Sequence, residues 1–183
     1  MNERDAVDLI RDAIPRSGGT WADLGAGEGA FTRALVELLG GDGRVYAVDR
    51  DAASIAALGR WANGATAGVI PVLADFTRPF ALPGLATSPL DGLLLANALH
   101  FVREADVVLG ALAARLRPGG RIVIVEYERE IASRWVPYPI PVSRLGTLAA
   151  SAGLSPPVVT ATRPSAFGGK LYVAVAERPA AAS

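Results

Sequence analysis

The stretch Asp23-Leu24-Gly25-Ala26-Gly27-Glu28-Gly29 decides which fold we expect for this chain. Together with the preceding Thr20-Trp21-Ala22, its first two residues are typical of a buried strand. Apolar residues at helical spacing follow from Phe31 to Leu39, and Gly40-Gly41 ends that helix. Glycines between a strand and a helix let the backbone approach a ligand that faces the helix N-terminus. The stretch therefore predicts a ligand site at this turn.

Strands and helices alternate along the rest of the chain. We expect strands at residues 45–49, 69–74, 90–96 and 121–126, and helices over 51–61, 104–116 and 143–153. This order predicts a doubly wound α/β fold with right-handed connections. Pro71 cannot donate a hydrogen bond to a neighbouring strand, so its strand is expected at an edge of the sheet. The last strands, 158–162 and 171–176, have no helix between them and predict a hairpin.

The length of 183 residues predicts one domain over the whole chain, 1–183. A short helix is expected within residues 1–14, before the first strand. Residues 127–142 contain three prolines and, after Tyr127, the aromatic side chains Trp135 and Tyr138, in a pattern that fits no regular element. A long irregular segment in a compact domain is usually functional, so we expect a lid or an acceptor-binding loop there.

The composition excludes several classes of function. Hydrophobic residues make up 51% of the chain, and 18 basic residues balance 18 acidic ones, so neither nucleic acid nor an anionic membrane is an expected partner. The absence of cysteine excludes thiol nucleophiles and thiolate metal sites, and we predict no metal site of any kind. Without a leader pattern or an apolar run long enough to span a membrane, the sequence predicts a cytoplasmic protein.

The glycine-rich turn alone is compatible with two nucleotide ligands. Gly25, Gly27 and Ala30 also satisfy the dinucleotide fingerprint, and Asp49 lies near the position where that fingerprint has its ribose-binding acid. Three features favour S-adenosylmethionine instead: an acid two positions before the first glycine, Asp75 with Phe76 after the third strand, and Gly119-Gly120 followed by a closing hairpin.

On these residues the chain resembles the class I S-adenosylmethionine-dependent methyltransferases, from Asp23 to Ala176. The resemblance implies a Rossmann-like, doubly wound sheet of seven strands in the order 3-2-1-4-5-7-6, with strand 7 antiparallel. It also implies S-adenosylmethionine as cofactor and S-adenosylhomocysteine as product. The cofactor-binding residues that it implies are Asp23, Gly25, Ala26, Gly27, Gly29, Asp49, Arg50, Asp75, Phe76 and Asn97. The alternative for Asp49 and Asp75 is that they only cap the elements that follow them.

The end of the fourth strand carries the candidate catalytic residue, His100. Many small-molecule members of the family have a segment like Asn97-Ala98-Leu99-His100 facing cofactor and acceptor, whereas enzymes that methylate the amino groups of adenine or glutamine have Asn-Pro-Pro-aromatic. His100 is the only histidine, and a neutral imidazole there could take a proton from an acceptor hydroxyl. The alternative is a half-buried histidine that packs beside Phe101.

Three residues are candidates for binding the acceptor: Glu126, Trp135 and Tyr138. Glu126 could bind a polar group or be a paired carboxylate, and the two rings could line an apolar acceptor or simply cover the end of the sheet. Arg129, Arg134 and Arg144 could hold an anionic acceptor or form a solvated rim.

The sequence thus predicts methyl transfer to a small-molecule acceptor, with O- or C-methylation of a hydroxylated or quinone-like compound as the refinement. One alternative is an NAD(P)-dependent oxidoreductase, which is disfavoured because no tyrosine has a lysine four residues on. The other is a protein that binds S-adenosylmethionine without catalysis. Either a monomer or a homodimer is compatible with the sequence.

Overall fold

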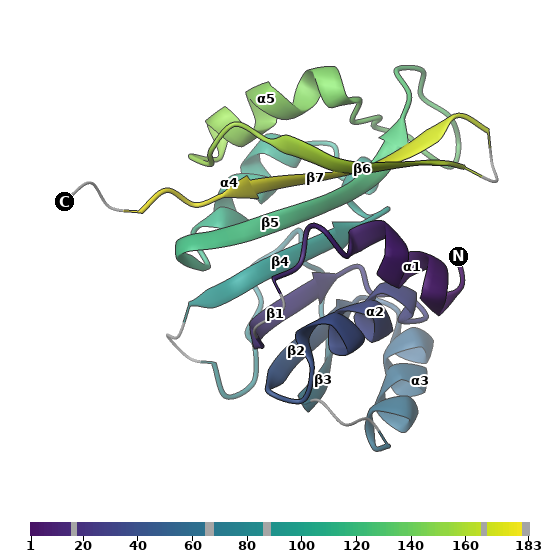
Figure 1. The fold of residues 1–183 in the computed structure, drawn as a ribbon, viewed down its shortest axis with the longest axis vertical. Coiled ribbons are helices and arrows are strands. Elements are labelled where there is room, and N and C mark those ends of the chain that lie inside the picture. The colour runs from purple at the N-terminus through teal and green to yellow at the C-terminus, as the bar shows by residue number, and fades with distance from the viewer. Residues whose placement is uncertain (16–17, 65–67, 86–88, 166–167, 181–183) are drawn as a thin grey trace.

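The computed structural model describes residues 1–15, 18–64, 68–85, 89–165 and 168–180. Its centre is a seven-stranded sheet in the order β3-β2-β1-β4-β5-β7-β6 (Figure 1). The strands β1 to β5 are parallel to one another, and β7 is antiparallel to both β5 and β6. The predicted fold, strand order and antiparallel seventh strand are therefore confirmed.

The strands are β1 (Gly19–Leu24), β2 (Gly43–Asp49), β3 (Gly68–Leu73), β4 (Leu90–Ala96), β5 (Leu116–Glu128), β6 (Val158–Pro164) and β7 (Lys170–Glu177). The helices are α1 (Glu3–Ile10), α2 (Ala30–Leu39), α3 (Ala52–Ala62), α4 (Ala105–Ala113) and α5 (Val142–Ser151), with one 3-10 turn at Leu99–Phe101.

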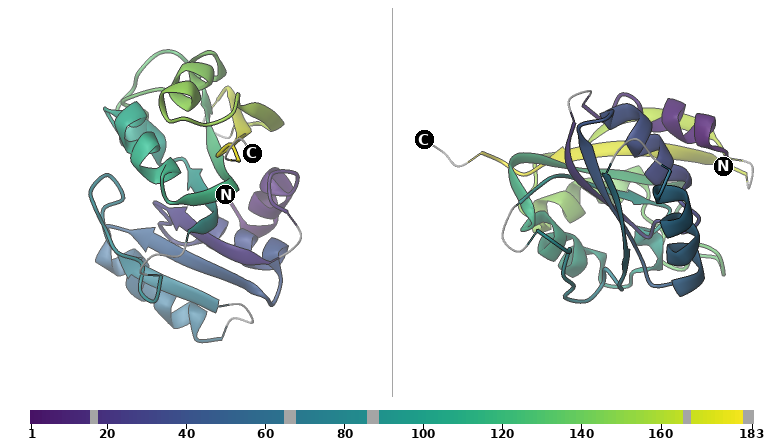
Figure 2. Two further views of the ribbon diagram at one scale, coloured as in Figure 1. Left: turned by 90° about the vertical axis from the view of Figure 1, so that its left-hand side faces the viewer. Right: turned by 90° about the horizontal axis from the view of Figure 1, so that it is seen from below.

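Helices cover both faces of the sheet, which gives three layers (Figures 1 and 2). Successive side chains of a strand point to opposite faces, so Trp21 packs in the cluster under α1 and α2, while its neighbour Ala22 packs in the cluster under α4 and α5. In β2, Ala47 packs with Leu58 of α3 on the first of these faces. Burial on both faces explains why the central strands read as continuous apolar runs.

Pro71 lies in β3, at one edge of the sheet, as its missing donor predicts. The predicted bounds differ from the observed ones mainly in β5. The predicted turn Pro118-Gly119-Gly120 lies within this strand. The amide of Gly119 donates to the Arg178 carbonyl, and the amide of Arg178 donates to the Gly120 carbonyl. The strand also continues to Glu128, so the irregular segment begins at residue 129 rather than 127.

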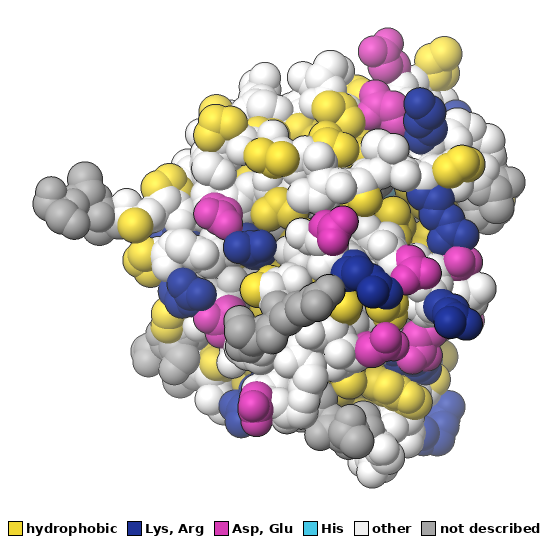
Figure 3. All heavy atoms as spheres, in the orientation of Figure 1, with side chains coloured by type: hydrophobic (Ala, Val, Ile, Leu, Met, Phe, Trp, Pro, Cys, Tyr) yellow, Lys and Arg dark blue, Asp and Glu magenta, His cyan; other side chains and the backbone are white. Residues whose placement is uncertain are grey.

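Parallel strands place their carboxyl ends at one edge of the sheet, and this edge positions the site. β1, β2 and β4 end at Leu24, Asp49 and Ala96, so the glycine turn, Asp49 and the 3-10 turn come together there. On the face shown in Figure 3, acidic and basic side chains lie interspersed. Among the described helices, none is both long and apolar enough to cross a membrane.

Candidate active site

The glycine turn is held against the end of β2 by backbone hydrogen bonds. The amides of Gly25 and Ala26 both donate to the Val48 carbonyl, at 2.8 and 3.0 Å. The amide of Gly27 donates to Oδ2 of Asp49 at 2.8 Å, and Oδ1 of Asp49 accepts from the amide of Asp51 at 2.8 Å. Asp49 therefore fixes both the turn and the chain that enters α3.

The three glycines of this turn have different requirements, although all have positive φ. A Cβ at Gly25 would lie 2.7 Å from the Cβ of Ala98, and one at Gly29 would overlap the side chain of Leu58. At Gly27 a Cβ would meet no atom within 4 Å. Packing against neighbouring side chains explains Gly25 and Gly29, whereas the space above Gly27 is open to a ligand.

A cavity of about 250 Å³, here called the nucleotide cavity, opens beside the turn. Of the ten residues predicted to bind the cofactor, six line it: Gly25, Asp49, Arg50, Asp75, Phe76 and Asn97. The remaining four, which are Asp23, Ala26, Gly27 and Gly29, are not among its lining residues. Its other walls come from Ala74, Thr77, Ala98, Phe101 and Val102, none of which was among the predicted cofactor-binding residues.

Asp23 is fully buried and accepts a hydrogen bond from the Thr32 hydroxyl at 2.6 Å, while its Oδ1 has no partner. Burial raises the pKa of Asp23 to about 7, although the Thr32 hydrogen bond lowers it, and the charge of Asp49 raises it further.

The pKa of Asp75 is shifted in the opposite direction. Hydrogen bonds from Thr77 lower the pKa of Asp75 below its usual value, so this group is ionised at neutral pH.

Asn97 joins the nucleotide cavity to a second one. It is the only described residue other than glycine with a positive φ, at 52°. Its amide donates to the Val125 carbonyl at 2.8 Å, and its buried Oδ1 has no partner. Strained backbone of this kind persists where the surrounding structure holds it, and it clusters at functional sites.

The second cavity, here called the acceptor cavity, has a volume of about 680 Å³. Asn97 and Phe101 line both cavities, so the two adjoin. The acceptor cavity is also lined by His100, Tyr127, Glu128, Arg129, Trp135, Val136, Gly168, Gly169 and Lys170. Trp135 is 75% exposed at its mouth, whereas Tyr138 is not among the lining residues and instead donates its amide to the His100 carbonyl at 3.0 Å.

His100 and Glu126 form a buried pair in which the two residues are 2% and 1% exposed. Nδ1 of His100 lies 2.6 Å from Oε2 of Glu126, and the amide of His100 donates to Oε1 at 3.1 Å. A carboxylate only accepts, so in the neutral imidazole this contact puts the proton on Nδ1 and the lone pair on Nε2. The rings of Phe101 and Tyr127 lie 4.3 and 5.9 Å from the His100 ring, between centroids.

Residues 22–120 match the family model of a methyltransferase domain, which covers more than half of the chain. The chain belongs to this family of methyltransferases. No curated protein sequence matches it. The sequence-based prediction of a class I S-adenosylmethionine-dependent methyltransferase is thereby confirmed.

Solved structures agree with this fold. An S-adenosylmethionine-dependent methyltransferase from Aquifex aeolicus superposes with a TM-score of 0.74 at 20% identity, over 94% of this chain and 89% of that one. The 1,6-didemethyltoxoflavin-N1-methyltransferase of Burkholderia thailandensis, solved with 1,6-didemethyltoxoflavin and S-adenosylhomocysteine, gives a TM-score of 0.74 at 23% identity, over 97% and 78%. The mitomycin 7-O-methyltransferase gives 0.71 at 16% identity, over 96% of this chain and 53% of that chain.

The residues of this methyltransferase fit its cofactor. S-adenosylmethionine carries an ammonium group, two ribose hydroxyls and an adenine amine, all of which donate hydrogen bonds. The site offers acceptors for them: the unpartnered oxygens of Asp23 and Asn97, and the carboxylates of Asp49 and Asp75 at the nucleotide cavity. The glycine turn leaves open space for the cofactor above Gly27.

Sequence reasoning missed six lining residues of the acceptor cavity, which are Tyr127, Glu128, Val136, Gly168, Gly169 and Lys170. One signal was available for Lys170: the strand order implied by the resemblance puts the antiparallel last strand beside the fifth, so the start of one meets the end of the other, and Glu128 indeed pairs with Lys170. No comparable signal exists for Val136, because its position depends on the path of the irregular segment after Glu128.

Proposed function

We propose that this methyltransferase methylates a hydroxyl oxygen of a small organic acceptor bound in the acceptor cavity. The observation that carries the proposal is the buried His100–Glu126 pair in the wall of that cavity, beside the residues that also line the nucleotide cavity. A paired imidazole of this kind suits the removal of a proton from an acceptor O–H.

The cofactor would occupy the nucleotide cavity. Asp49 would hold the ribose hydroxyls, Asp75 and Phe76 the adenine, and Asp23 with the glycine turn the methionine end, as the family resemblance implies. When bound, S-adenosylmethionine supplies an electrophilic methyl group on a positively charged sulfur. Because the donor is already activated, the protein has mainly to align the acceptor and exclude water.

His100 would act as the base. Its Nε2 accepts the hydroxyl proton as the oxygen becomes nucleophilic, and the imidazolium that forms is stabilised by the Glu126 carboxylate 2.6 Å from Nδ1. Glu126 has both oxygens engaged with His100, so we assign it the positioning of the base rather than contact with the acceptor.

Tyr127 would orient the acceptor. Burial raises the pKa of its hydroxyl above the usual value, and the Glu126 charge adds to this effect. The phenol therefore stays protonated at neutral pH and can donate a hydrogen bond to an acceptor oxygen. Phe101 and Trp135 supply flat apolar walls on which an aromatic or quinone-like acceptor would pack.

The test uses isotopically labelled S-adenosylmethionine with a panel of phenols, catechols and hydroxyquinones, followed by mass spectrometry for methylated product. NMR of the product distinguishes methyl on oxygen from methyl on carbon. With the acceptor that turns over, we expect His100→Gln to lower the single-turnover rate about a hundredfold, because proton removal is lost in the transition state. Affinity for S-adenosylhomocysteine should stay unchanged.

Two variants complete this experiment. Glu126→Gln keeps the shape of the pair but removes the charge that stabilises the imidazolium, so it should lower the rate and alter its dependence on pH while the protein stays folded. Arg103→Gln, at an exposed residue that lines neither cavity, is the control and should react normally. A folded His100→Gln enzyme within a few-fold of the normal rate would refute the assignment of the base. A product methylated on carbon would refute the choice of oxygen.

A further inference from the structure

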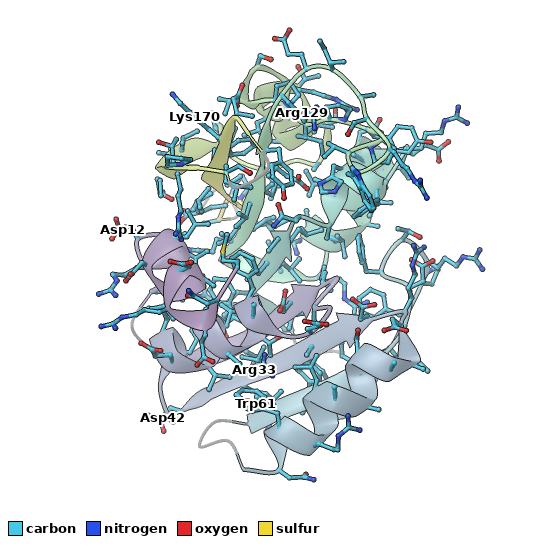
Figure 4. The ribbon with its side chains drawn as sticks, turned by 90° about the vertical axis from the view of Figure 1, so that its right-hand side faces the viewer. Asp12, Arg33, Asp42, Trp61, Arg129 and Lys170 are labelled. Carbon is cyan, nitrogen blue, oxygen red and sulfur yellow. The ribbon has the colours of Figure 1, made fainter. Side chains whose placement is uncertain are left out.

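Two basic residues stand at the mouth of the acceptor cavity without a use in the mechanism above. Arg129 follows the end of β5, and Lys170 begins β7. The antiparallel register pairs Lys170 with Glu128, the neighbour of Arg129 in the chain. Both basic side chains are labelled in Figure 4, at the same end of the molecule, and both line the cavity while being exposed to solvent.

Other arginines have partners that account for them. Arg134 lies over the ring of Trp135, and Arg144 donates to the Pro139 carbonyl. Arg163, whose neighbour Pro164 pairs with Lys170 in the hairpin, forms an ion pair with Asp5 of α1. By contrast, Arg129 makes one long contact of 3.4 Å to the hydroxyl of Ser133, and neither it nor Lys170 has an ion pair within the described part of the chain.

The acidic groups nearby do not cancel these charges. The Glu126 carboxylate is buried and taken up by His100. Glu128 lines the cavity, but its Oε2 accepts from the amide of Val142 at 3.0 Å, at the start of α5. Two cations, Arg129 and Lys170, therefore face one carboxylate, Glu128, which leaves a net charge of one positive unit among the charged residues at the mouth.

The polar groups are separated along the cavity. His100 is 2% exposed and lies beside residues shared with the nucleotide cavity, whereas Arg129 and Lys170 are exposed. The wall also contains Phe101, which lines both cavities, together with Trp135 and Val136, and these three side chains offer apolar contacts. A ligand that satisfies the whole cavity has a hydroxyl at its inner end, a ring in the middle and an anionic group at its outer end.

We propose that the acceptor is an aromatic hydroxy acid whose carboxylate is bound by Arg129 and Lys170. The inference rests on the proposed function, because it takes the acceptor cavity as the place of the acceptor. One carboxylate matches the single net positive charge of the mouth, and the planar guanidinium of Arg129 suits its two oxygens. Arg129 and Lys170 are then residues that determine specificity, and they take no part in the methyl transfer itself.

The experiment measures binding rather than turnover. Hydroxybenzoates, hydroxycinnamates and hydroxynaphthoates are titrated against the protein saturated with S-adenosylhomocysteine, each beside its uncharged primary amide. We expect at least one acid to bind about threefold to tenfold more tightly than its amide at low ionic strength, the range that two exposed charge contacts give. Added salt should reduce this preference, because exposed charges are screened.

The double variant Arg129→Gln/Lys170→Gln should lose the preference while its affinity for the amide stays the same. Arg129→Lys with Lys170 intact keeps the charge and should retain most of the preference. Arg103→Gln, at an exposed arginine that is not among the lining residues, is the matched control and should bind the acid normally. The proposal is overturned if no acid in the panel binds better than its amide, or if the preference survives in the double variant. Methyl transfer to a neutral phenol alongside either result would leave the proposed function standing.

Discussion

Asp49 carries two structural hydrogen bonds in addition to the role proposed for it. Its Oδ2 holds the amide of Gly27 and its Oδ1 the amide of Asp51, so the carboxylate ties the glycine turn to the start of α3. The same side chain lines the nucleotide cavity. The alternative that Asp49 only caps the following element is therefore partly true, and the two roles have to be separated by experiment.

Replacement of Asp49 separates them. Asp49→Ala should lower the affinity for S-adenosylhomocysteine tenfold or more, because charge-assisted hydrogen bonds to the two ribose hydroxyls are lost, at a cost of about 1.5–3 kcal/mol. Isothermal titration calorimetry measures this change. Asp51→Ala is the control, since Asp51 caps α3 through the amide of Ser54 but does not line the cavity. Equal losses in both variants would mean that Asp49 acts only by holding the start of α3, which the two residues share.

The acids at the ends of β1 and β2 and after β3 could be predicted because each is fixed by its place after a strand, and the strands are visible as apolar runs. Tyr127 and Lys170 could not be assigned in the same way. Their position depends on how far β5 and β7 extend, and these strands are longer than the apolar pattern indicates because backbone pairing continues beyond it.

At the scale of elements, the turn between β1 and α2 shows how a glycine pattern can hide different causes. Gly25 and Gly29 are required by the neighbouring side chains of Ala98 and Leu58, which the sequence pattern cannot indicate, since these contacts join distant parts of the chain. Only Gly27 faces open space. The alternation of strands and helices predicts a doubly wound sheet with right-handed connections and a final hairpin, but it does not fix the order of the strands, which was implied by the family resemblance and is confirmed.

The open space at Gly27 leads to a prediction about the turn. Gly27→Ala should cost about 1–2 kcal/mol of stability, because its φ is 52°, and should in addition weaken cofactor binding at least tenfold by placing a methyl group in that space. Gly153→Ala is the matched control: Gly153 has a φ of 68°, also meets no atom within 4 Å of a Cβ, and follows α5. Thermal unfolding measures the first effect and calorimetry the second. Normal binding by Gly27→Ala would show that the turn is only a tight connection.

For the whole molecule, the raised pKa of Asp23 makes the free energy of unfolding depend on pH. The pKa of Asp23 is about 7 in the folded protein and 3.8 for an exposed aspartate, so between these two pH values the folded state holds a proton that the unfolded state releases. The free energy of unfolding should therefore fall as the pH rises from about 4 to about 7 and then level off. The total change is on the order of 4 kcal/mol, since one pKa unit corresponds to about 1.4 kcal/mol.

Asp23→Asn isolates this effect, because the amide keeps an oxygen to accept from the Thr32 hydroxyl but does not titrate. Urea unfolding without cofactor, at intervals from pH 4.5 to 8, should show the variant gaining stability over the wild type as the pH rises, until the difference becomes constant above about pH 7. Asp51, Asp75 and Asp91 do not interfere, because their pKa values are lowered, so their contribution is lost only in more acidic solution. Asp12→Asn, at an exposed site, controls for the loss of one carboxylate. A constant difference between wild type and Asp23→Asn across this range would mean that Asp23 is ionised throughout, and its buried charge would then need a partner other than Thr32.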